Sequence, residues 1–134
     1  MPKGRKEPRW LSRFVVDAIQ IEQLKEHGGL PGIRDENALE SALARARNKS
    51  TYGNEDDLAA LAAAYAFGLV TSHPYCDGNK RVGFLALVTF LGINGCDFSA
   101  TDEEVVTEIL KLAGGRLSEE QLTSWIRLHI RQPK

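Results

Sequence analysis

The chain has 134 residues, which lies within the usual size of one domain and suffices to bury a core without disulfides or metals. Its 17 basic and 18 acidic residues leave a net charge of −1, so it lacks the overall positive charge of proteins that coat nucleic acid or an anionic membrane. We therefore expect function to come from a local site, with neither direct nucleic-acid binding nor membrane attachment.

The N-terminal segment, residues 1–9, carries four basic residues and two prolines. It lacks the apolar stretch of a secretory signal, so we predict a flexible basic tail followed by a single domain over residues 10–134. From Ser12 the apolar spacing predicts a helix that ends at Gly28-Gly29. Its inward-facing stripe is expected to contain Phe14, Ala18, Ile21 and Leu24, widened by Val15 and Ile19.

Two further helices are predicted in the first half of the chain. Asp35 is expected to cap a helix that ends near Arg47, and a polar break over residues 48–54 follows. An alanine-rich helix then begins at Asp56 or Asp57 and ends at His73-Pro74, because the residue before a proline is disfavoured in the helical conformation. Its small side chains favour close packing against neighbouring helices.

The next helix, predicted over residues 79–94, is apolar on most faces, so we expect it at the centre of the fold. Its longest uncharged apolar stretch has about 12 residues, whereas a bilayer span needs about 20. Cys76 and Cys96 flank this helix, whose ends would lie about 24 Å apart, too far for a disulfide. Two free thiols are typical of a reducing compartment, which indicates a cytoplasmic protein.

Two capping boxes, Thr101–Glu104 and Ser118–Gln121, predict the last two helices. No alternating apolar pattern longer than a few residues suggests a β-strand. The sequence therefore predicts an all-α fold, a compact bundle of about six helices around residues 79–94.

One segment, residues 73–81 (His-Pro-Tyr-Cys-Asp-Gly-Asn-Lys-Arg), concentrates chemically active side chains. It forms the predicted turn before the helix over residues 79–94, where free N–H groups and the positive end of the helix dipole make an anion site. Lys80 and Arg81 add positive charge there, and Gly78 lets a ligand approach the backbone. Together these residues predict a site that handles phosphate.

Each of these residues also has a purely structural interpretation. His73 alone is most often a structural histidine, and Asp77 is most simply an N-cap. Asn79 alone suits a turn, and Lys80 with Arg81 usually forms a solvated face. Caps and turns do not require all of these residue types at once, which favours the functional interpretation.

The segment resembles the signature of the Fic superfamily, His-Pro-Phe-x-Asp/Glu-Gly-Asn-Gly-Arg-x-x-Arg. It departs from that signature at Tyr75, at Lys80 in place of the second Gly, and at Phe84 in place of the last Arg. Lysine in place of the second Gly, together with the absence of the last Arg, is the pattern of the death-on-curing (Doc) branch. The members of this branch are the toxins of toxin–antitoxin modules. Residues 27–36 and 39–43 are similar to the N-terminal region of the same branch.

Toxins of the Doc branch are implied to be kinases that move the γ-phosphate of ATP to a threonine of elongation factor Tu and so block translation. For such a reaction we expect His73 to accept the hydroxyl proton. Asp77 is expected to bind Mg²⁺ together with the phosphates. Lys80 and Arg81 are expected to stabilise charge on the transferred group.

Gly78 and Asn79 would complete the nucleotide-binding site, Asn79 by fixing either the loop or a phosphate oxygen. Lys80 fills space in which AMP-transferring Fic proteins accommodate phosphates, and Phe84 removes a cation, so we expect phosphoryl transfer. AMP transfer by the same residues is the alternative, and a non-catalytic Fic-fold binding module is a third possibility.

The loop over residues 28–35 is expected to act as a flap that docks the target peptide through its cation, Arg34. The alternative is that Arg34 pairs with a nearby acid and holds the loop. Self-regulating Fic proteins carry an inhibitory helix with Ser/Thr-x-x-x-Glu-Gly/Asn, and here Glu36-Asn37 is preceded at the required distance by Gly32 instead. A separate antitoxin is therefore the implied partner, in addition to the translation factor.

Overall fold

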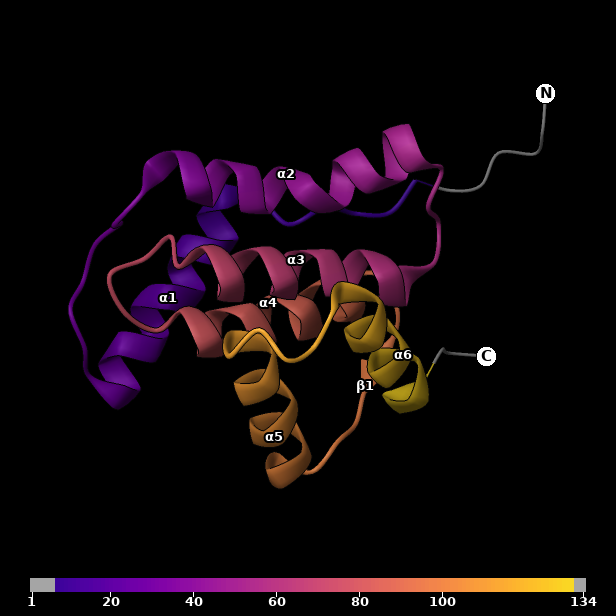
Figure 1. Ribbon diagram of the computed structural model, residues 1–134. Helices are drawn as coiled ribbons and strands as arrows, with labels where there is room; N and C mark the ends of the chain where they lie inside the picture. The colour runs from indigo at the N-terminus through magenta and orange to yellow at the C-terminus, as the bar shows by residue number, and fades with distance from the viewer. Residues whose placement is uncertain (1–6, 132–134) are drawn as a thin grey trace.

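The computed structural model describes residues 7–131 (Figure 1). Its elements, in chain order, are α1 (Arg13–His27), α2 (Glu36–Gly53), α3 (Leu58–Ser72), α4 (Asn79–Ile93), β1 (Asp97–Phe98), α5 (Asp102–Ala113), α6 (Glu119–His129) and β2 (Ile130–Arg131). The predicted all-α fold of six helices is confirmed. The two short strands pair antiparallel, with Phe98 opposite Ile130. Residues 1–6 of the predicted basic tail lie outside the described residues.

The helices begin where the sequence places capping residues. One side-chain oxygen before each of five helices accepts a hydrogen bond from a backbone N–H of the first turn, on Ser12, Asp35, Asp57, Thr101 and Ser118. Both predicted capping boxes are formed. The first N–H groups of a helix have no intrahelical acceptor, so these polar residues fix the starting points. None of the helices found over residues 7–131 has the length and apolar character needed to cross a membrane.

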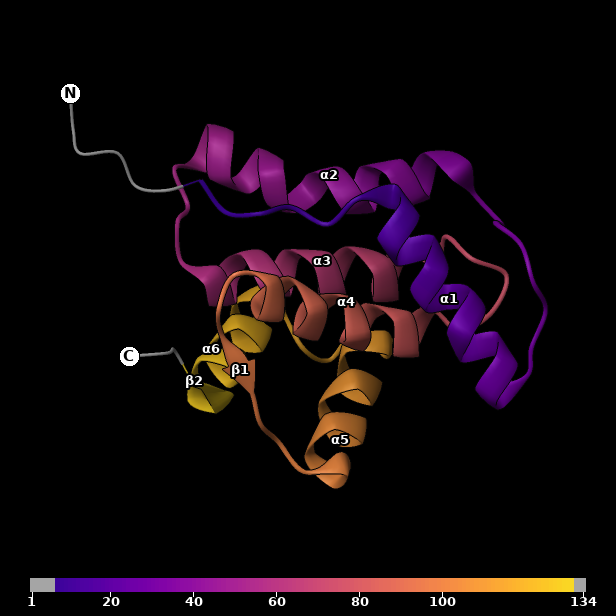
Figure 2. The ribbon, with the colours of Figure 1, turned by 180° about the vertical axis from the view of Figure 1, so that it is seen from behind.

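The core is centred on α3 and α4, which lie side by side in both views (Figures 1 and 2). Eleven of the fifteen residues of α3 are buried, six of them alanines. Gly83 of α4 faces α3 so closely that a Cβ atom there would lie 2.5 Å from Cγ2 of Val70. The helix predicted over residues 79–94 is therefore central, and α3 shares that position.

The predicted end of the second helix is wrong. Instead of ending near Arg47, α2 continues to Gly53 and closes at Asn54, which adopts the left-handed conformation. The segment predicted as a polar break is helical because its polar groups have partners in the fold: Lys49 Nζ donates to the Ala60 carbonyl at 3.2 Å and to the Glu119 carboxylate at 2.8 Å.

The predicted inward face of the first helix is only partly correct: Val15 and Ile19 pack against the core as expected. Phe14 and Ile21 are 81% and 53% exposed, whereas Val16 and Gln20 are buried. Figure 2 shows α1 crossing one end of the bundle, beside the N-terminal end of α4. Only the narrow face of α1 that touches this end of the bundle is buried. Part of its apolar stripe therefore remains exposed to solvent.

Candidate active site

Residues 73–78 form the loop that joins α3 to α4. His73 ends α3 in the left-handed conformation (φ 49°), and Gly78, also left-handed (φ 86°), begins α4. This motif loop runs beside residues 28–35: the Arg34 and Asp35 N–H groups both donate to the Pro74 carbonyl, at 2.7 and 3.0 Å. Two segments that lie about forty residues apart in sequence are thus held together by backbone hydrogen bonds.

Asn79 fixes the shape of the motif loop. Its side chain is buried; Oδ1 accepts from the Tyr75 N–H at 3.0 Å, and Nδ2 donates to the Tyr75 carbonyl at 3.0 Å. The amide therefore satisfies both backbone groups of one buried residue. Of the two roles expected for Asn79, the structure shows the one in which it fixes the loop.

Tyr75 ties the motif loop to α1. Its Oη donates to Asp17 Oδ1 at 2.7 Å, and Asp17 Oδ2 accepts from Arg13 Nε at 3.0 Å. Arg13 also binds Glu36 and Glu40 of α2. Burial and the contact with Asp17 raise the pKa of Tyr75, so the phenol stays a proton donor. The hydroxyl that distinguishes tyrosine from phenylalanine thus connects three segments of the fold.

Asp77 is not the N-cap of α4, contrary to its simplest structural interpretation. Gly78 occupies the N-cap position, and no side chain makes the capping hydrogen bond. Asp77 Oδ2 instead accepts from the Leu30 N–H at 2.7 Å, and its carbonyl accepts a longer bond, 3.4 Å, from Gln20 Nε2. The carboxylate therefore bridges the motif loop to residues 28–35 and remains beside the start of α4.

Arg34 contacts the backbone of the motif loop. Its Nε donates to the His73 carbonyl at 2.6 Å, and one of its terminal nitrogens donates to the Ser72 carbonyl at 2.8 Å. The last carbonyls of a helix lack intrahelical donors, so the guanidinium caps α3. The alternative interpretation, in which Arg34 holds the loop by pairing with an acid, is therefore half correct. Arg34 does hold the loop, but its partners are backbone carbonyl groups and not a carboxylate.

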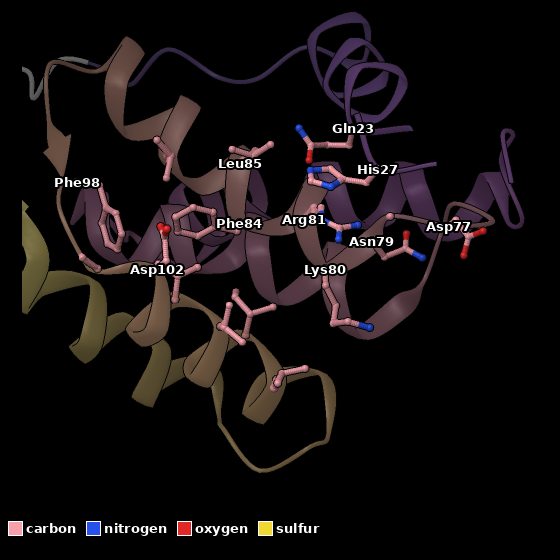
Figure 3. A pocket seen from close by; sticks show the side chains of 17 residues that line it. Gln23, His27, Asp77, Asn79, Lys80, Arg81, Phe84, Leu85, Phe98 and Asp102 are labelled. Atoms are coloured by element: carbon pink, nitrogen blue, oxygen red, sulfur yellow. The ribbon is translucent and has the colours of Figure 1, made fainter. Parts of the chain in front are cut away.

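A cleft of about 1000 Å³ opens beside the N-terminus of α4 (Figure 3). Residues 77–81 form its polar end together with Gln23 and His27 of α1. The remaining wall is mostly apolar and comes from α4, α5 and the segment between them: Phe84, Leu85, Val88, Phe98, Ala100, Asp102, Val105, Val106, Ile109 and Leu110. Five of the predicted site residues thus line one cavity. His73 and Arg34 are not part of its lining, and the exposed His73 lies at the other end of the motif loop.

Asp77 is the carboxylate available for a metal ion at the start of α4. Over residues 7–131 no group of three or more His, Cys, Asp or Glu side chains comes together to hold a metal. Mg²⁺ commonly binds through one or two carboxylates plus substrate phosphates and keeps several waters. Asp77, with one oxygen engaged by Leu30, fits that mode of binding rather than a metal site made by the protein alone.

The side chains that α1 and α5 contribute to the cleft were not predicted from the sequence. Gln23 and His27 lie on the same side of the cleft as Arg81 in Figure 3, and Asp102 lies beside Phe84 and Phe98. His27 directly precedes the Gly28-Gly29 pair, so the sequence already placed it next to the loop over residues 28–35. Nothing in the spacing of Asp102 indicated that α5 would face α4.

Comparison with known proteins agrees with this geometry. The model of the Fic/DOC family matches residues 10–91, a segment that contains α1 to α3, both loops and most of α4. The chain belongs to the Fic/DOC family. It is also 30% identical over 87 residues to the protein kinase doc of Escherichia phage P1, an alignment that covers 65% of this chain and 69% of that protein.

The Fic/DOC match includes every residue assigned to the polar end of the cleft. It ends at Leu91, before β1 and α5. The wall formed by Phe98, Asp102 and Val105 therefore lies outside the part of the chain that the family model describes.

Proposed function

We propose that this Fic/DOC chain is the toxin of a toxin–antitoxin module and a kinase that transfers the γ-phosphate of ATP to a hydroxyl of elongation factor Tu, which blocks translation. The observation that carries the proposal is the uncapped N-terminus of α4, flanked by Lys80 and Arg81, at one end of a cleft and on the same loop as His73. Family membership and the similarity to a protein named as a kinase support it.

The start of α4 suits a chain of phosphates. With Gly78 as N-cap and no side chain bound to it, the first N–H groups of α4 are available to an anion. Lys80 and Arg81 are exposed and line the cleft. Charge on a transferred phosphoryl group would be stabilised by these donors, which are already in place before the reaction.

His73 is the base in this proposal. Its imidazole is exposed and makes no hydrogen bond to any residue in the described part of the chain, while Arg34 fixes its backbone carbonyl. The hydroxyl of the target gives its proton to the His73 ring, and its oxygen forms a bond to the γ-phosphorus. The bond from that phosphorus to the bridging oxygen breaks, and ADP leaves with the electron pair.

Asp77 would hold Mg²⁺ in this reaction. When bound, the ion would neutralise part of the phosphate charge. The hydrogen bond from Leu30 orients the Asp77 carboxylate without any metal, because it fixes Oδ2 against the backbone of residues 28–35. Gly78, which has no Cβ, leaves room for the phosphates beside this carboxylate.

Phosphoryl transfer is preferred to AMP transfer because of the side chains beyond Arg81. Lys80 occupies the start of α4, and Phe84 lines the cleft and packs edge-on against Phe98, with ring centroids 5.8 Å apart. This part of the cleft therefore offers an aromatic surface where an arginine would hold further phosphates.

An antitoxin and a cytoplasmic location complete the proposal. The family resemblance implies that Doc toxins are neutralised by a separate protein, and the chain has no match to the inhibitory Fic segment. Arg34 would contribute to the docking of the target by holding residues 28–35 against the motif loop.

The test is transfer of label to purified elongation factor Tu from ATP carrying the label in either the γ- or the α-phosphate. The parent chain should transfer γ-label alone, and His73→Ala should transfer none. His129→Gln, a histidine change in α6 outside the cleft, is the matched control and should retain transfer. Label from the α-phosphate would establish AMP transfer instead, and absence of both labels with an active preparation of the factor would refute the kinase proposal.

A further inference from the structure

The side chains that line the cleft change from cationic to aromatic along α4. Along α4, the side chains of Arg81, Phe84 and Val88 line the cavity, and at 1.5 Å per residue they extend over about 10 Å. Phe98 packs against Phe84 on one side and against Trp125 on the other, with centroids 5.8 and 5.4 Å apart. The cavity is thus cationic at its start and presents a fixed aromatic surface further along.

Asp102 places a negative charge at the aromatic end. It is the first residue of α5, is exposed, and lies beside Phe84 and Phe98 in Figure 3. Among the described residues it has no hydrogen-bond or salt-bridge partner, whereas Glu104 of the same turn binds the Thr101 N–H and approaches His129. The Asp102 carboxylate is therefore free to accept a hydrogen bond from an occupant of the cleft.

The positive charge at one end of the cleft and the negative charge at the other determine which ligands fit and in which orientation they bind. An occupant that matches it has an anionic group at Lys80 and Arg81, a flat apolar part against Phe84 and Phe98, and an N–H donor at Asp102. A nucleoside triphosphate with an amino group on its base has these three features in this order. A ligand with a further negative charge or only acceptors at its far end would be repelled by the carboxylate.

We propose that Asp102 is a specificity-determining residue that accepts a hydrogen bond from the amino group of the nucleotide base, while Phe84 and Phe98 stack against the base. This inference rests on the proposed function and adds the basis of nucleotide choice. The amino group can belong to adenine or guanine. The family match ends before this wall, which fits a feature that differs among relatives sharing the phosphate end.

The experiment compares nucleotides that differ only in the amino group. Dissociation constants are measured by calorimetry for ATP against purine riboside triphosphate, which has hydrogen in place of the amino group, and for GTP against inosine triphosphate. A hydrogen bond to a charged group predicts a preference of about tenfold or more for one amino-bearing nucleotide. The pair that shows it identifies the base.

Asp102→Ala should abolish this preference, and Glu103→Ala is the matched control. Glu103 belongs to the same acidic first turn of α5 but does not line the cleft, so its removal has the same effect on the helix terminus and should leave the preference intact. Equal preferences in the parent and in Asp102→Ala would overturn the inference.

A second readout uses the tryptophan behind the aromatic wall. In a Trp10→Phe background the remaining tryptophan is Trp125, which contacts Phe98. Its fluorescence should change with the preferred nucleotide and not with inorganic triphosphate, which lacks a base. If the nucleotide binds and transfers its phosphate but Trp125 does not respond, this inference fails while the proposed function stands, and the apolar wall is left to a partner protein. If no nucleotide binds, both fail.

Discussion

The close approach of α4 to α3 predicts that alanine at position 83 destabilises the protein. A methyl group there would lie 2.5 Å from Cγ2 of Val70, whereas carbon atoms in contact are normally about 3.5–4.0 Å apart. Val70 is fully buried, and a β-branched side chain in a helix has one strongly preferred rotamer. The two helices must therefore move apart.

The magnitude follows from two opposing effects. Overpacking of a core costs about 1–3 kcal/mol, and replacing glycine by alanine within a helix returns about 1 kcal/mol. For Gly83→Ala the free energy of unfolding should therefore fall by about 1 kcal/mol, with a maximum loss of about 2 kcal/mol. Because the shift also displaces the start of α4, we expect γ-phosphate transfer to decrease.

Gly92→Ala is the matched control, since it makes the same change in the same helix where nothing lies within 4 Å of the added methyl group. It should stabilise the protein by about 0.5–1 kcal/mol. Both variants are compared with the parent by urea unfolding monitored by circular dichroism. A Gly83→Ala protein as stable as Gly92→Ala would refute the packing argument. In a double-mutant cycle, Val70→Ala should relieve the clash, with a coupling energy of about 0.5–3 kcal/mol.

Three further predictions concern the site and its supports. Asn79→Ala leaves the N–H and carbonyl of Tyr75 without partners, so urea unfolding should show a loss of about 2 kcal/mol or more, together with loss of label transfer; unchanged stability would contradict the assigned hydrogen bonds. Tyr75→Phe removes the donor to the Asp17 carboxylate and should cost about 1.5–3 kcal/mol, as for a hydrogen bond to a charged group, measured in the same way, and no loss at all would show that this hydroxyl does not hold the loop. Burial of Glu119 would raise its pKa, but hydrogen bonds from Lys49 and Arg45 outweigh this effect and hold the pKa below its ordinary value. Its contribution to stability is thus fully present above the ordinary carboxyl pKa and is lost as the pH falls through the lowered one. The difference in unfolding midpoint between the parent and Glu119→Gln should therefore shrink from pH 7 to pH 3, and a difference that stays constant would contradict this assignment.

Local signals in the sequence were enough to predict the starts of the helices and the part of the site formed by residues 77–81. Ser12, Asp35, Thr101 and Ser118 cap helices through contacts within four residues, so they act independently of the rest of the fold. Residues 77–81 are consecutive, and a turn followed by a helix brings their polar groups together without distant partners. The family resemblance rested on the longer segment over residues 73–84 that contains them, and on residues 27–36 and 39–43.

The errors concern interactions between segments that are far apart in the chain. Phe14 is exposed and Gln20 buried because α1 meets the bundle along a narrow face whose direction depends on α4. The structural alternative for Asp77 also failed: Asp77 is bound by Leu30 and does not cap α4, since residues 28–35 lie beside the motif loop. The extension of α2 to Gly53 depends on acceptors for Lys49 in α3 and α6.

The sequence by itself determined that the chain is helical, where most helices begin, and which continuous segment concentrates the polar side chains of the proposed phosphate site, because each of these properties depends on neighbours within a few positions. Only the tertiary structure decided that Arg34 caps α3, that Tyr75 reaches Asp17, and that Asp102 stands at the far end of the cleft. The contacts of Arg34 and Tyr75 join residues 38 or more positions apart, and their geometry is set by how close-packed helices such as α3 and α4 can approach one another.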